Sequence, residues 1–249
     1  MWPSLLAIAL APGVAIMLYI YWRDRHDREP IRHLVICFIL GILSAVFAVL
    51  IDKGLEPVQT EMTEPNSIGD KLFTAFIMAA LVEEFCKFFM CRVYAYPKRD
   101  FNEPLDGIVY MVMVAMGFAT IENVLYVFQN PETGMQTGIL RMFLAVPGHA
   151  CWGVIVGYFM GLAKFKAKNK FLYMFIGLFI GILLHGTYDA ALFLRESNEL
   201  GGGEYEGLLI SGALGTCILS YVLAFMAIRK HRKISRQLFP KDKNAPVAV

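Results

Sequence analysis

Charged side chains are scarce in this chain of 249 residues. Asp, Glu, Lys and Arg make up 18% of it, against about 25% in an ordinary soluble domain. Connections between the apolar runs are short, so none can hold a large extramembrane domain. Because 57% of the residues are hydrophobic, we expect one polytopic integral membrane domain and exclude an ordinary soluble fold.

Cysteine spacing and net charge exclude two further classes. No pair of cysteines has the spacing of a disulfide scaffold or a zinc finger, and we interpret all of them as packing residues. They are Cys37, Cys86, Cys91, Cys151 and Cys217. The net charge is only +2, so we expect no nucleic-acid partner. Internal repeats and low-complexity segments are also absent from the sequence.

Apolar runs long enough to cross a bilayer as helices are the main feature of the sequence. We place about seven, at residues 3–22, 34–51, 72–91, 107–128, 138–163, 171–194 and 207–228. The first has no preceding basic residue and is too long for a signal peptide, so we expect a retained helix.

The distribution of Lys and Arg predicts the orientation. These residues gather in the first, third and fifth connections and after residue 228, which predicts an outside N-terminus and a cytoplasmic C-terminus. The predicted fold is an all-α bundle of about seven transmembrane helices. It consists of a membrane domain at 1–228 and a basic cytoplasmic tail at 229–249, in contact with the lipid bilayer.

Ionisable side chains interrupt several of these apolar runs. A charge at the centre of a membrane helix costs about 2.5–3.5 kcal/mol on insertion scales, so such groups indicate function. The residues concerned are Glu83, Glu84, Lys87, Glu122, His149, His185 and Asp189. We predict that several helices bring them into one buried polar site, open toward the outer side.

The spacing of the acidic residues predicts their partners. Glu83 and Lys87 are four residues apart and should pair on one helix face, whereas Glu84 points about 100° away without a partner at that spacing. A purely structural Glu–Lys pair would leave Glu84 unexplained. Glu122 has no basic neighbour within a helical turn, so its partner must be water or another helix. Asn123 fits an interhelical hydrogen bond.

Each membrane histidine continues a stripe of glycines four residues apart. His149 precedes one stripe, and His185 follows the other with Asp189 four residues beyond. The stripes are Gly153, Gly157 and Gly161, and Gly177 and Gly181. Small residues at this spacing let helix backbones approach closely. Packing along the glycines should therefore bring the two imidazoles together.

Four motifs resemble those of the PrsW family of intramembrane proteases, over about residues 30–195. In chain order they are Glu83-Glu84-Phe-Cys-Lys87, Phe118-x-x-x-Glu122-Asn123, His149 and His185-x-x-x-Asp189, and Asp106-Gly107-Ile-Val-Tyr110 is also similar. The wider superfamily of type II CAAX prenyl proteases and bacteriocin-processing enzymes has an Arg one residue later than Lys87. It also has a His in place of Glu122, so the chain resembles PrsW more closely than a prenyl protease.

The resemblance implies a multi-pass protease of the bacterial plasma membrane. Its substrate would be a single-pass membrane protein of the anti-sigma factor class, cut near the extracytoplasmic side as the first step of regulated proteolysis in a stress response. Oligomerisation is compatible with the glycine stripes.

Amide hydrolysis needs an activated water, an oxyanion stabiliser and an acid for the leaving amine. We expect Glu83 or Glu84 to take the water proton, and Glu122 to position that water. His149 or His185 would polarise the carbonyl and protonate the leaving nitrogen.

Three further residues would support these catalytic glutamates and histidines. Lys87 would hold the glutamate pair, and Asp189, one turn beyond His185, would fix the orientation of that imidazole. Asn123 would serve packing.

A metal-dependent version is equally open. His149, His185 and Glu122 could bind Zn²⁺, with Glu83 or Glu84 as the base, although the sequence lacks His-Glu-x-x-His. No other cofactor is expected. Three alternatives stay open: a proton-coupled transporter or channel that uses the same intramembrane groups, a CAAX-type prenyl-protein protease, and a non-catalytic membrane chaperone or sensor.

Overall fold

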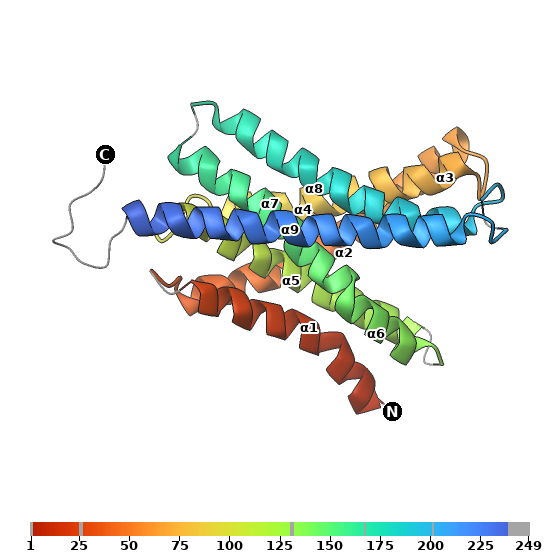
Figure 1. Cartoon of the computed structure of the whole chain (residues 1–249), viewed down its shortest axis with the longest axis horizontal. Coiled ribbons are helices and arrows are strands. Elements are labelled where there is room, and N and C mark those ends of the chain that lie inside the picture. Colours follow the sequence, from red (N-terminus) through yellow and green to blue (C-terminus); the bar gives the residue numbers. More distant parts are fainter. Residues whose placement is uncertain (1, 25–26, 130–131, 167, 201, 239–249) are drawn as a thin grey trace.

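The computed structural model describes residues 2–24, 27–129, 132–166, 168–200 and 202–238. Within these ranges all regular structure is helical. Five long helices are continuous: α1 (Trp2–Arg23), α2 (Ile31–Met62), α5 (Pro104–Gln129), α8 (Lys170–Phe193) and α9 (Glu206–Leu238). They lie along an elongated bundle, with α9 across one face (Figure 1). The predicted all-α membrane fold is confirmed, because six described helical segments are long and apolar enough to cross a membrane.

The predicted membrane segment at 72–91 takes a composite form in place of a seventh such helix. It consists of α3 (Ile68–Phe73), a π-helix η1 (Thr74–Leu81) and α4 (Val82–Tyr94), which follow one another directly. π-helical turns are rare and often lie at functional sites. Here the wide turn packs against α8 and ends immediately before Glu83 and Glu84.

The predicted segment at 138–163 is divided at Leu144 into α6 (Gly134–Phe143) and α7 (Ala145–Phe165). Pro147 explains the break, because a proline has no N–H to donate to the carbonyl four residues earlier. That carbonyl, of Phe143, instead accepts a 2.9 Å hydrogen bond from the Tyr221 hydroxyl in α9. The break lets both α6 and the start of α7 face one cavity.

Two helices extend beyond their predicted ends. The apolar run of α2 stops near residue 51, but the helix continues to Met62. Likewise α9 continues to Leu238, past the predicted start of the tail at residue 229. Hydropathy marks only the apolar part of each helix. The extensions contain polar residues, which can also adopt a helix in water. Residues 239–249 of the predicted tail lie outside the described part of the chain.

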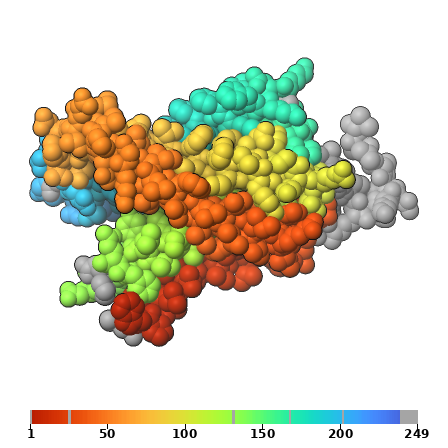
Figure 2. Space-filling model, turned by 180° about the vertical axis from the view of Figure 1, so that it is seen from behind, coloured from red at the N-terminus to blue at the C-terminus, as the bar shows by residue number. Residues whose placement is uncertain are grey.

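Helix α5 forms the centre of the bundle. Every residue from Pro104 to Thr120 is buried, and α5 packs against α1, α2 and α7. The face opposite α9 is crossed by α2, which lies next to α4 (Figure 2). Asp106, in the first turn of α5, fixes the start of the helix, since its Oδ2 accepts hydrogen bonds of 2.7 Å from the backbone N–H groups of Asn102 and Glu103. The five cysteines are buried, as expected of packing residues.

The two glycine stripes do not face each other. A Cβ on Gly157 of α7 would lie 2.3 Å from the carbonyl oxygen of Gly107, so this stripe packs against α5. The stripe on α8 does face α7, where a Cβ on Gly177 would lie 2.5 Å from the Cβ of Phe159. The expectation that both stripes join α7 to α8 is therefore wrong for α7. Spacing defines a helix face but does not say which neighbour it meets.

Gly157→Ala should destabilise the bundle because the new methyl group would force α5 and α7 apart. Overpacking of this kind typically costs about 1–3 kcal/mol, measurable as a lower free energy of unfolding in mixed micelles. Gly215→Ala in α9 is the matched control, since a Cβ there meets no atom within 4 Å. Equal stability of the two variants would show that the close approach of α5 and α7 is not needed.

Candidate active site

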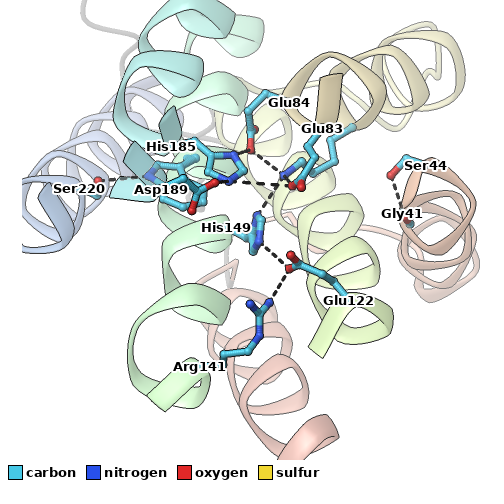
Figure 3. A network of polar contacts seen from close by, with 12 residues as sticks. Gly41, Ser44, Glu83, Glu84, Glu122, Arg141, His149, His185, Asp189 and Ser220 are labelled. Atoms are coloured by element: carbon cyan, nitrogen blue, oxygen red, sulfur yellow. Dashed lines mark hydrogen bonds and ion pairs between the residues drawn. The ribbon is translucent and has the colours of Figure 1, made fainter. Parts of the chain in front are cut away.

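A cavity of about 350 Å³ lies where α4, α5, α6, α7 and α8 meet. Five predicted site residues line it: Glu83, Glu122, His149, His185 and Asp189. Three others do not line the cavity but contact residues that do: Glu84 contacts His185, Lys87 contacts His149, and Asn123 contacts Arg141. All eight therefore belong to one continuous polar network, part of which is drawn in Figure 3. The prediction of one buried polar site formed by several helices is confirmed.

Glu84, and not Glu83, is the closer partner of Lys87. Lys87 Nζ donates to Glu84 Oε1 at 2.6 Å and lies 3.6 Å from Glu83 Oε2. Glu84 has no partner four residues away, as expected, but it pairs with Lys87 at a spacing of three, because residues three apart on a helix are neighbours just as those four apart are. Lys87 thus contacts both glutamates, as predicted. Glu84 and Lys87 are 1% and 0% exposed, so this ion pair is dry.

His149 connects the lysine to Glu122. Its Nδ1 lies 3.0 Å from Lys87 Nζ, and its Nε2 lies 3.0 Å from Glu122 Oε2. Because an ammonium group only donates, Nδ1 accepts and the ring proton is on Nε2, facing the carboxylate. Arg141 Nη2 of α6 also lies 2.6 Å from Glu122 Oε2. The expectation that Glu122 finds its partner on another helix is confirmed.

His185 lies between two carboxylates. Its Nδ1 is 3.0 Å from Glu84 Oε1, and its Nε2 is 3.0 Å from Asp189 Oδ2 and 4.0 Å from Glu83 Oε2. The Trp152 ring stacks on the imidazole with centroids 4.0 Å apart and an interplanar angle of 14°, which fixes the plane of the ring. The imidazoles of His149 and His185 are 5.1 Å apart, so their predicted approach is confirmed.

Arg141 and Trp152 are functional-site residues that the sequence did not single out. Arg141 Nε donates to Asn123 Oδ1 at 3.0 Å, while Asn123 Nδ2 donates to the Ala9 carbonyl of α1 at 2.9 Å. Asn123 thus makes the expected interhelical contact. Arg141 was hidden because it lies near a segment end, where arginine is ordinary. Trp152 follows His149 by three residues, a spacing that indicates a shared face.

Three side chains of the cavity fit a metal ion. Glu83, His149 and His185 each offer a ligand atom within 4.8 Å of the others, and two histidines with one carboxylate form a common catalytic zinc set. Glu83 Oε2 is buried without a hydrogen-bond partner. His149 Nε2 faces Glu122 and His185 Nε2 faces Asp189, as at many zinc-binding histidines; His185 Nδ1 also faces Glu84. Glu83 is thus the third candidate metal ligand beside the two histidines, in the place that the sequence analysis gave to Glu122.

Comparison with known proteins agrees with this site. The sequence model of a family described as "PrsW family intramembrane metalloprotease" matches residues 29–230, which include the whole site. Protease PrsW of Geobacillus kaustophilus (strain HTA426) is 36% identical over 207 residues, or 83% of this chain and 86% of that protein. Protease PrsW of Bacillus subtilis (strain 168) is 34% identical over 190 residues, or 76% and 83%. That of Clostridioides difficile (strain 630) is 34% identical over 195 residues, or 77% and 80%. No solved structure matches the chain.

Proposed function

Because this chain belongs to the PrsW family of intramembrane metalloproteases, we propose that its cavity hydrolyses a peptide bond in a single-pass membrane protein through a glutamate-activated water. The protein is a membrane-embedded protease that crosses a bacterial membrane several times. One observation supports the proposal most: four carboxylates and two imidazoles line a single cavity inside the bundle.

We assign the role of general base to Glu83. Its Oε2 is buried without a hydrogen-bond partner in a side chain that lines the cavity. Glu84 Oε1 is instead engaged by Lys87 and His185, and Glu84 does not line the cavity. Glu83 Oε2 would take the proton from a water whose oxygen attacks the scissile carbonyl carbon. Glu84 would position Lys87 and His185.

The proton for the leaving amine is assigned to His185. Carboxylates face both of its ring nitrogens, which favours the doubly protonated ring, and Nε2 can pass its proton to the departing nitrogen. His149 is less suited, because its Nδ1 faces the Lys87 ammonium. It would instead hold Glu122, which with Arg141 forms the opposite wall and positions the water.

In a metal-dependent version, Glu83, His149 and His185 would be ligands of a divalent metal, and Glu83 and His185 would not then serve as free base and protonated acid. The metal would supply Lewis-acid polarisation of the carbonyl and a more acidic water. Lys87 Nζ, at 3.0 Å from His149 Nδ1, would have to withdraw from that nitrogen to make it a ligand. The Nε2–H group of His149 would continue to donate to Glu122 Oε2, which would hold the ring in place.

Metal removal should therefore inactivate the enzyme. Treatment with a chelator in proteoliposomes is expected to lower the cleavage rate at least about tenfold, and Zn²⁺ should restore it. The rate of product formation is measured before chelation, after it and after metal addition. Full activity after exhaustive chelation would contradict the metal fit and leave catalysis to the glutamates and histidines alone.

The proposed substrate is a single-pass protein of the anti-sigma factor class, cut near the extracytoplasmic side. The cavity is also lined by Thr137, Arg195 and Glu196, near the ends of α6 and α8 that the distribution of Lys and Arg places outside. Proteoliposomes containing the enzyme and such a substrate test this directly. Product masses should place the cut near the outer end of the substrate helix, whereas a cut at the inner end would contradict it.

Asp189→Asn should be milder than loss of the base. The amide keeps the shape of the side chain but removes the charge that faces His185 Nε2 at 3.0 Å. Residues that orient a catalytic or metal-binding histidine typically contribute about 10- to 100-fold to activity, and kcat should fall by that amount. Asp52→Asn in α2, outside the cavity, is the matched control. A wild-type rate for Asp189→Asn would remove Asp189 from the mechanism.

A further inference from the structure

Two cavities that share no lining residue with the catalytic cavity meet on α9. The larger, about 790 Å³, lies between α7, α8 and α9, and its wall is mainly apolar, with Phe159, Ile180 and Leu223 among its residues. The smaller, about 520 Å³, lies between the C-terminal ends of α1 and α9, which are at the same end of the bundle (Figure 1). Three residues line both, Phe225, Arg229 and Lys233. An apolar groove thus continues directly into a second chamber.

The smaller cavity is strongly cationic. Its charged lining residues are Arg23, Arg229, Arg232, Lys233 and Arg236, and no described carboxylate lines it. No ion pair between described residues involves Arg229, Lys233 or Arg236. Arg23 Nε is buried without a hydrogen-bond partner. Arg229, Lys233 and Arg236 therefore present positive charges that no ion pair between described residues neutralises.

Two buried carboxyl groups near this end do not cancel that charge. Burial raises the pKa of Asp24 to about 6. Burial and the charge of Asp24 raise the pKa of Glu103 to about 7. At neutral pH the two carboxyl groups together carry less than two full negative charges. The cationic side chains of the cavity outnumber them.

The apolar cavity opens where lipid chains would lie. Phe225 and Met226 on its rim are 49% and 60% exposed. The Arg229 guanidinium lies 5.3 Å from the ring centroid of Phe225, one turn earlier on α9, and both residues line both cavities. A positive charge therefore lies where the apolar cavity meets the cationic one.

We propose that the joined cavities bind one anionic phospholipid, with an acyl chain along Phe159, Ile180 and Leu223 and the phosphate among Arg229, Lys233 and Arg236. An amphiphile with a negative head is the ligand whose two parts match the two chambers. A zwitterionic lipid lacks the net charge, and free phosphate leaves the apolar chamber unused. Basic pockets between membrane helices bind anionic head groups by this chemistry. The site is separate from the catalytic cavity and is independent of the proposed substrate.

Native mass spectrometry of the full-length protein in detergent, titrated with phosphatidylglycerol, tests the site. We expect saturable retention of one phosphatidylglycerol per chain. The triple variant Arg229→Gln, Lys233→Gln, Arg236→Gln should weaken it at least about tenfold, given the contribution of each basic residue near an anionic lipid surface. Phosphatidylcholine should not saturate the site, and inorganic phosphate should not compete at the concentrations of the lipid.

A second triple variant separates a specific site from general charge. Lys166→Gln, Lys168→Gln, Lys170→Gln removes the same charge from exposed positions in the connection between α7 and α8, outside both cavities, and should bind phosphatidylglycerol as the wild type does. Equal weakening by both triples would overturn the proposal, as would equal retention of phosphatidylcholine or full competition by phosphate. The charge-preserving variant Arg229→Lys, Lys233→Arg should keep the lipid. Its failure to bind, with an unchanged melting temperature in lipid-free detergent, would also overturn the proposal.

Discussion

Glu83→Gln should lower kcat about 10³-fold while leaving the bundle folded, because removal of a positioned general base typically costs about 10²- to 10⁴-fold. Glutamine keeps the size of the side chain but cannot take a proton from water. Glu83 Oε2 makes no hydrogen bond and is only 3.6 Å from Lys87 Nζ, which keeps Glu84 at 2.6 Å, so the loss of stability should be smaller than for Glu84→Gln. Cleavage in proteoliposomes gives kcat and KM, and unfolding in mixed micelles reports the fold.

Two variants make this result specific to Glu83. Glu64→Gln changes the same functional group at an exposed position and should leave the rate unchanged. Glu84→Gln should also reduce kcat, but with a measurable loss of stability, because Glu84 Oε1 contacts both Lys87 and His185. If Glu83→Gln kept more than a tenth of wild-type activity, Glu83 would be neither base nor metal ligand.

Lys87→Met should be the most destabilising single change in the site. The ammonium group is 2.6 Å from Glu84 and 4.3 Å from the Phe118 ring centroid, and Lys87 is 0% exposed. Methionine fills similar space but leaves the buried Glu84 carboxylate without the ammonium group that pairs with it. Removal of one partner of a buried ion pair costs about 3–5 kcal/mol, measurable as a lower free energy of unfolding.

A double-mutant cycle shows whether the loss comes from the unpaired charge. Lys87→Met, Glu84→Gln should recover much of the stability lost in Lys87→Met, since no charge is then left unpaired. Lys71→Met is the control, because Lys71 pairs at 3.7 Å with Glu196, whose side chain is 75% exposed. Such surface pairs contribute about 0–1 kcal/mol. Additive losses in the double variant would mean that Lys87 and Glu84 act independently.

Much of the site could be predicted because the membrane makes its residues conspicuous. Any ionisable side chain inside an apolar run needs a partner, and this reasoning found the carboxylates, Lys87 and both histidines without a structure. It also predicted that Glu122 has its partner on another helix, where Arg141 and His149 now lie. The fold class follows from the lengths of the apolar runs alone.

Other features depend on three-dimensional packing. The π-helix at Thr74–Leu81 has no signal in hydropathy, yet it immediately precedes the glutamates. The helix break at Leu144 follows from Pro147, but the Tyr221 contact that satisfies Phe143 joins residues 78 apart in the sequence. Glycine spacing could not say that Gly157 faces α5. The third candidate metal ligand, Glu83 in place of Glu122, likewise depends on which side chains converge.

Membership of the family favours proteolysis over the transport, scaffold and prenyl-protease alternatives that the sequence left open. The geometry supports the same conclusion. A proton relay needs only a chain of titratable groups, whereas here Trp152 fixes the plane of His185 and Asn123 fixes Arg141. Fixed orientation of this kind suits chemistry on a bound substrate.

The most direct measurement is cleavage of a single-pass substrate by the purified protein in proteoliposomes, with wild type, Glu83→Gln and Glu64→Gln compared at equal reconstituted amounts. We expect wild type and Glu64→Gln to release the same product at the same rate, and Glu83→Gln to release almost none. The same rate from Glu83→Gln as from wild type would contradict the assignment of this cavity as the active site.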